Sequence, residues 1–218
     1  MNRRFDSHPF WGSHSSLSAL TGAGLIIMAS SRFSFALVCA GALIWTHGLS
    51  ALVFSAARVI IPTRGRRVIL LFLAAFFCGI FMLLAGLINP LLILGTGFFL
   101  VLVPSCCLGS GFFKASESES PVEVFSRALL EALVIAGLIL ALALIREPLG
   151  MGTLSFPGGI QGMVEIFDIN VENGYIPVRF LSASAGGLLL LGYGIALFRY
   201  FREQSGSVPR DDAQEGDR

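Results

Sequence analysis

Cysteine supplies the chemistry that this chain could carry. Its four cysteines are Cys39, Cys78, Cys106 and Cys107. The adjacent pair follows Pro104, which lacks an N–H and should open a helix at that point. Backbone groups freed by such a break cannot face lipid, so we expect the break to be buried in protein or to line a polar path. Thiolates there could hold iron, but iron clusters usually take four cysteines, so this pair would need ligands from elsewhere.

The other candidate residues indicate structure more than catalysis. The remaining two cysteines lie in uninterrupted apolar runs, where cysteine commonly serves as a small apolar side chain. His47 is expected to be a buried, neutral imidazole. Glu131 is expected to pair with Arg127 at helical spacing or to line an ion path. The sequence contains no dinucleotide fingerprint, phosphate loop or Ser–His–Asp order, so soluble-type catalysis is not encoded.

The composition assigns the chain to the membrane. Hydrophobic residues make up 55% of the 218 residues and charged residues only 13%, and the mean hydropathy is +0.79. A soluble domain of this size could not cover so much apolar surface. The net charge of +1 provides no basic face, which excludes a nucleic-acid-binding function. Membrane lipid is therefore the expected surrounding.

Six apolar runs are candidates for crossing a hydrocarbon layer about 30 Å thick. They cover residues 17–30, 34–57, 68–88, 91–113, 124–145 and 178–201. The second, third, fifth and sixth runs are long enough to be plain transmembrane helices. The first run is short and contains Thr21-Gly22-Ala23-Gly24, and the fourth is interrupted at Pro104. We therefore expect the first and fourth segments to be broken helices.

The two expected breaks indicate an internal repeat. When the six runs are divided into three and three, the broken segments stand first in each half, as in proteins built from inverted repeats. The predicted fold is all-α, a polytopic membrane protein with six transmembrane helices in two inverted three-helix halves. The predicted parts are a cytoplasmic N-terminal segment (1–16), a membrane domain (17–202) and a disordered cytoplasmic tail (203–218).

Basic residues predict the orientation of the chain. With both termini in the cytoplasm, the cytoplasmic loops carry most of the basic residues. The cytoplasmic set is Arg3, Arg4, Arg58, Arg64, Arg66, Arg67, Lys114, Arg199 and Arg202, and the outer set is Arg32, Arg146 and Arg179. The outer face then also holds the long segment 146–177. Its acids, Glu165, Asp168 and Glu172, are expected to belong to a solvated loop.

Two short motifs carry a family resemblance. Ser105-Cys106-Cys107 with Gly111 precedes the fifth apolar run, and Arg146-Glu147-Pro148-Leu149-Gly150-Met151-Gly152-Thr153-Leu154 follows it. Together they resemble the membrane subunits of the Rnf complex and of the sodium-translocating NADH:quinone oxidoreductase, specifically the RnfE/NqrD type. The family's motifs are a Thr-Asn-Cys turn with Gly four residues later, and Arg-Glu-x-Leu-Gly-x-Gly-Thr-Leu. The similarity extends more weakly over residues 18–202.

The resemblance implies a partner, a cofactor and a function. It implies pairing with a homologous RnfA/NqrE-like subunit, beside other Rnf/Nqr-type subunits, in the bacterial cytoplasmic (inner) membrane. It also implies a [2Fe-2S] cluster between the two homologues, to which each gives one cysteine from each broken helix. Cys107, with Cys106, is then the metal and cofactor-binding site. The implied function is an integral membrane subunit that carries or scaffolds transmembrane electron transfer in an ion-translocating complex.

The chain departs from the family in its first helix. The family's first cysteine lies in a Leu-Cys-Pro turn, and the matching stretch, residues 21–25, contains no cysteine. Three explanations stay open: the cluster is absent, Cys106 substitutes beside Cys107, or Cys39 is the ligand. A protein of a different class, a small six-helix transporter such as the membrane component of a vitamin uptake system, has similar length and hydropathy and is the alternative function.

Overall fold

The computed structural model of the chain describes residues 16–57, 66–109, 120–158, 162–168 and 178–205. The helices are α2 (Ser16–Ala29), α3 (Phe33–Ala56), α4 (Arg66–Ile88), α5 (Pro90–Leu100), α6 (Val103–Gly109), α8 (Pro121–Met151), α9 (Arg179–Ser182) and α10 (Ser184–Ser205). The strands are β1 (Thr153–Pro157) and β2 (Met163–Asp168). The predicted N-terminal segment and C-terminal tail lie almost entirely outside the described residues.

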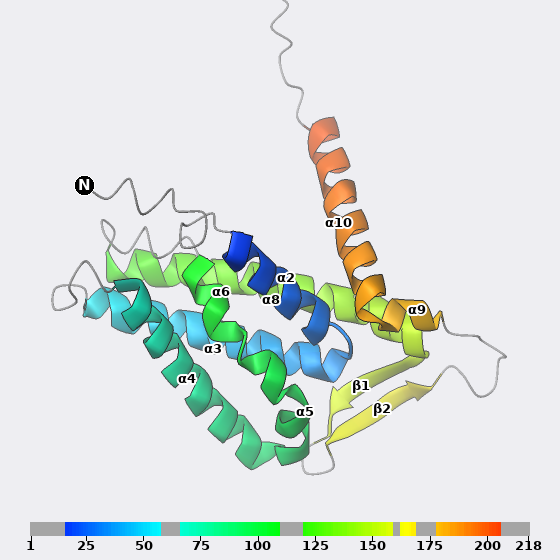
Figure 1. The fold of residues 1–218 in the computed structure, drawn as a ribbon, viewed down its shortest axis with the longest axis horizontal. Coiled ribbons are helices and arrows are strands. Elements are labelled where there is room, and N and C mark those ends of the chain that lie inside the picture. The colour runs from blue at the N-terminus through cyan, green and yellow to red at the C-terminus, as the bar shows by residue number, and fades with distance from the viewer. Residues whose placement is uncertain (1–15, 58–65, 110–119, 159–161, 169–177, 206–218) are drawn as a thin grey trace, which may run out of the picture.

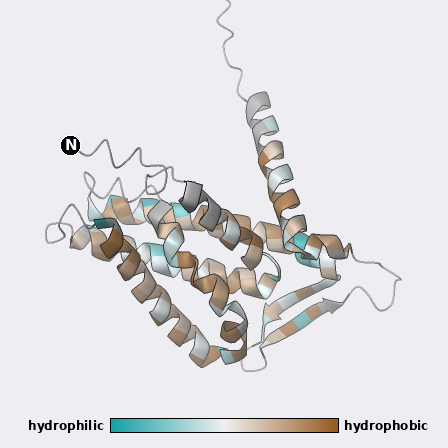
Figure 2. Cartoon of the chain, viewed as in Figure 1, coloured by the Kyte–Doolittle hydropathy of each residue, from teal (hydrophilic) through white to brown (hydrophobic). Residues whose placement is uncertain are grey.

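Three helices are long and apolar enough to cross a membrane. They are Phe33–Ala56, Val68–Ile88 and Pro121–Met151. Figure 2 shows hydrophobic residues along most of their length. The helical membrane class is therefore confirmed. Six crossings stay a prediction, because α5 and the apolar part of α10 are shorter helices and α2 has only 14 residues.

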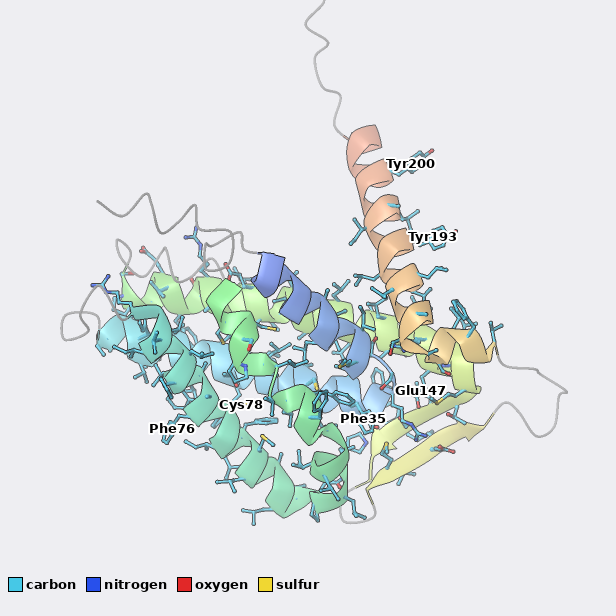
Figure 3. The ribbon with its side chains drawn as sticks, in the orientation of Figure 1. Phe35, Phe76, Cys78, Glu147, Tyr193 and Tyr200 are labelled. Atoms are coloured by element: carbon cyan, nitrogen blue, oxygen red, sulfur yellow. The ribbon has the colours of Figure 1, made fainter. Side chains whose placement is uncertain are left out.

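Helix α3 is the centre of the bundle. It lies antiparallel to α8 (Figure 1), and this pair makes the most extensive contact between the described elements. Ala128, Ala132 and Ala136 are buried at four-residue spacing on α8, which lets two helix backbones approach closely. Helix α4 has much of its surface exposed, including Phe76, whose side chain points away from the bundle (Figure 3). An exposed apolar face of this kind is suited to lipid.

The prediction that the first helix is broken is wrong within the described residues. Helix α2 runs without interruption through Gly22 and Gly24. Glycine keeps its backbone N–H, so the helical hydrogen bonds can continue at a cost of roughly 1 kcal/mol per glycine. Neither position is crowded, because a Cβ atom at Gly22 or Gly24 would meet nothing within 4 Å. Glycine alone was thus an insufficient signal for a break.

The fourth segment is broken, as predicted, and so is the sixth, which was expected to be a plain helix. Helix α5 ends at Leu100 and α6 begins at Val103, so the break lies just before Pro104. In the sixth segment, Ala183 separates α9 from α10 and adopts an extended conformation (φ −73°, ψ 156°). Helix α10 then leaves the bundle, and Tyr193 and Tyr200 project from it (Figure 3).

One end of the bundle gathers the α2–α3 turn, the α4–α5 turn and a β-hairpin. Strands β1 and β2 pair antiparallel in the segment that was predicted to be a loop. The Asn89 side chain, before α5, donates to the Gly162 carbonyl at 2.7 Å. Arg32 lies 3.8 Å from Glu165 on β2. The clustering of these turns follows from helices that alternate in direction, although the predicted membrane orientation is not tested by it.

Candidate functional site

The α5–α6 break has a defined partner for the carbonyl that it frees. In a continuous helix the residue at position 104 would donate to the Leu100 carbonyl, but Pro104 has no N–H. The Cys78 thiol on α4 lies 3.3 Å from the Leu100 oxygen and donates to it instead. Figure 3 labels Cys78 on α4. The cysteine expected to be an apolar filler therefore satisfies a backbone group within the membrane domain.

Beyond the break, Cys107 faces the central helix. Its side chain is fully buried, and its Sγ lies 3.5 Å from Nδ1 of His47 on α3. The same Nδ1 lies 3.0 Å from the Leu43 carbonyl. Because a carbonyl oxygen only accepts, Nδ1 carries the proton of the neutral ring, and Nε2 carries the lone pair. This confirms a buried, hydrogen-bonded His47 and gives Cys107 a partner within its own chain.

The two adjacent cysteines have different surroundings. Cys106 belongs to a hydrophobic cluster that also contains Cys39 and Cys78. Cys107 is not part of that cluster and contacts His47 instead. Successive residues of a helix point about 100° apart, so the two side chains leave the helix in different directions. Both thiols are nevertheless buried, and the Cys107 thiol interacts electrostatically with Cys106 and Cys78 as well as contacting His47.

The shared cluster that the resemblance implies stays a prediction, and the described residues supply only part of the family's ligand set. The family would take one cysteine from each broken helix, and α2 contains none between residues 21 and 25. On α6, the Cys107 thiol is buried against α3 rather than presented on the chain's surface. Across the described part of the chain, no group of three or more His, Cys, Asp or Glu side chains could hold a metal ion.

The second constellation is Arg146, near the end of α8. Its side chain is only 2% exposed. Nε donates to the Leu181 carbonyl at 2.8 Å, and Nη2 donates to the carbonyls of Ser182 at 2.8 Å and Ala183 at 2.9 Å. Nη1 donates to the Ile27 carbonyl at 2.5 Å and to the Ser30 hydroxyl at 3.0 Å. All five N–H groups of the guanidinium are thereby satisfied.

Glu147, the residue after Arg146, accepts hydrogen bonds from backbone N–H groups. It is 1% exposed and lies where α8, β1 and the start of α3 meet (Figure 3). Oε2 accepts from the Phe33 N–H at 2.6 Å, and Oε1 accepts from the Ser155 N–H at 2.9 Å. Phe33 is the first residue of α3, so the carboxylate stands at the positive end of that helix.

The dipeptide therefore fastens both sides of the α2–α3 turn. Arg146 binds acceptors at the end of α2, and Glu147 binds a donor at the start of α3. A cation at a helix C-terminus and an anion at an N-terminus both complement the helix dipole. We call Arg146, Glu147 and their hydrogen-bonded partners the junction.

The glycines of the Arg-Glu motif are needed by the same junction. Gly152 caps the end of α8 in the left-handed conformation, with φ 73°, which favours glycine. A Cβ atom on Gly150 would lie 2.9 Å from the Ser182 backbone nitrogen. The motif thus combines two charged side chains with a close approach of α8 to α9.

Sequence reasoning missed the roles of Cys78, Arg146 and Glu147. The two adjacent charges at the end of an apolar run marked Arg146 and Glu147 as unusual without showing their partners, and no signal in the sequence marked Cys78. The expected alternatives for Glu131 stay predictions; its side chain is half-buried and that of Arg127 is exposed. Both residues take part in interactions.

Comparison with known proteins adds no assignment. No protein-family model matches the chain, and no curated protein matches it.

Proposed function

We propose that the chain is an integral membrane subunit of an ion-translocating electron-transport complex of the Rnf/Nqr type, where it scaffolds transmembrane electron transfer beside a homologous RnfA/NqrE-like subunit. The observation that carries this proposal is the broken α5–α6 segment, which places a cysteine-bearing half-helix against the central helix α3. Broken helices inside membrane proteins are tolerated where protein covers them, and they commonly form working sites.

A second line of support comes from the Arg-Glu motif. Four of the seven residues that match the family are ones that the fold constrains: Arg146 and Glu147 are buried and hydrogen-bonded, Gly150 is in close contact, and Gly152 has a positive φ. A structural role for these four residues supports the proposal, because a motif that fixes helix contacts can be shared by proteins of one architecture.

The scaffolding role is favoured over the carrying role by the ligand set. Cys107 stands at a family ligand position, its counterpart on α2 is missing, and its thiol contacts His47. These residues are consistent with a complex in which the partner subunit holds the redox group. This chain would then supply helices that enclose that group.

The test is purification of the full-length chain from native membranes in mild detergent. We expect a second, homologous membrane subunit and redox subunits to co-purify. Iron content and the electron paramagnetic resonance spectrum of the reduced complex are then compared for wild type, Cys107→Ser and the matched control Cys39→Ser. A signal lost only with Cys107→Ser would show that the chain carries the cluster. Recovery of the chain without redox subunits, but with a bound small molecule, would refute the proposal and favour the transporter.

A further inference from the structure

The α9–α10 break presents the kind of oxygen atoms that bind cations. Three consecutive carbonyl oxygens, those of Leu181, Ser182 and Ala183, face the Nε and Nη2 side of the Arg146 guanidinium, and the Ile27 carbonyl and Ser30 hydroxyl face Nη1. In membrane proteins, unwound carbonyls and the C-terminal ends of helices are the groups that coordinate cations. Each of these five acceptors is uncharged, so together they attract positive charge without neutralising it.

We propose that these five acceptors form a cation-binding cradle that the chain fills with its own Arg146 guanidinium, and that takes a free guanidinium ion when that side chain is truncated. The cradle matches a planar cation with five donors in a fixed fork, because the five acceptors use all five N–H groups. It does not match a point charge equally well. The proposal does not depend on the electron-transport function.

Gly187 on α10 packs closely against the Arg146 guanidinium. A Cβ atom on Gly187 would lie 2.9 Å from Nη1 and 3.1 Å from Cζ of Arg146, and 3.2 Å from Ile27. Gly187 is buried, as is Ser30. The side chain therefore lies in a slot between α2 and α10, where a cation that left could be replaced only by one of similar thickness.

In the wild-type protein the tethered Arg146 guanidinium occupies all five acceptors. A free cation therefore has access to them only when that side chain is truncated.

The test uses the purified full-length chain and follows thermal unfolding through thiol labelling, because all four cysteines are buried. Arg146→Ala is expected to lower the Tm by about 10 °C, given the cost of leaving buried polar groups unpaired. Millimolar guanidinium chloride is expected to recover part of this loss and to saturate. Equal ionic strengths of sodium or potassium chloride should recover much less.

Two further variants guard against a trivial result. Arg32→Ala removes an arginine at the same end of the molecule whose partner Glu165 is partly exposed, and guanidinium should not stabilise this control. In Arg146→Ala/Gly187→Ala the added methyl group occupies the slot, so the guanidinium response should disappear. If the Arg146→Ala protein cannot be purified in folded form, membranes that contain it are solubilised in detergent with and without guanidinium chloride. A higher yield of folded protein with the ion supports the cradle.

The proposal is overturned if guanidinium stabilises neither the folded Arg146→Ala protein nor its yield. It is equally overturned if sodium or potassium matches guanidinium, or if the double variant responds as strongly as the single one.

Discussion

Replacement of Glu147 is the sharpest test of the junction. Its two carboxylate oxygens serve two different backbone donors, Phe33 N–H at 2.6 Å and Ser155 N–H at 2.9 Å. Glutamine has the same shape but only one accepting oxygen, so one of the two donors must meet an NH2 group. A buried hydrogen bond to a charged group contributes about 1.5–3 kcal/mol. Glu147→Gln should therefore lower the free energy of unfolding by about 1.5–3 kcal/mol, and Glu147→Ala by about 3–6 kcal/mol.

The assay is reversible unfolding in mixed micelles of mild detergent and dodecyl sulfate, followed by circular dichroism. The matched control is Glu165→Gln, which alters a partly exposed ion pair at 3.8 Å and should cost less than about 1 kcal/mol. The order wild type, Gln, Ala in decreasing stability is the signature of two separate acceptors. A Glu147→Gln protein as stable as wild type would refute the claim that both oxygens are used.

The remaining predictions concern the helix breaks and contacts. Cys78→Ala should destabilise the chain by about 1–3 kcal/mol, because the Leu100 carbonyl loses its donor. Cys78→Ser keeps a donor and should retain most of the stability. Equal losses of stability for the two variants in unfolding assays would contradict the hydrogen bond. Gly150→Ala should cost about 1–3 kcal/mol through overpacking against Ser182, measured beside Gly137→Ala, where a Cβ atom meets nothing within 4 Å. If the two alanine variants are equally stable, the close approach of α8 to α9 is wrong.

Hydropathy predicted the long helices of this fold well. Helices α3 and α4 begin and end within two residues of the apolar runs, since a span of this length leaves few alternatives to a helix in hydrocarbon. Helix α8 contains its run but continues to Met151, beyond the predicted end at residue 145. Pro104 likewise predicted the break before α6, because a missing N–H is a local property. Gly22 and Gly24 misled, because a missing side chain does not remove a hydrogen bond.

The junction could not be predicted because its acceptors are backbone atoms. Arg146 binds carbonyls of α2 and of the α9–α10 break that carry no mark in the sequence, and three of them, from Leu181 to Ala183, belong to that break. Cys107 was predicted to matter, and its contact with His47 depends on how α6 packs against α3. Spacing along the chain cannot reveal contacts between helices that are far apart in sequence.

The separation of these contacts bears on how the protein is made. Ile27 and Arg146 are 119 residues apart, and Phe33 and Glu147 are 114 residues apart. During synthesis, the α2–α3 turn therefore emerges long before the side chains that bind it. Until α8 has been inserted, the carbonyls at the end of α2 and the N–H groups at the start of α3 must be served by water or by the insertion machinery. The α2–α3 turn is thus completed only after α8 is in place, and a nascent chain that ends before Arg146 lacks both of its fastenings.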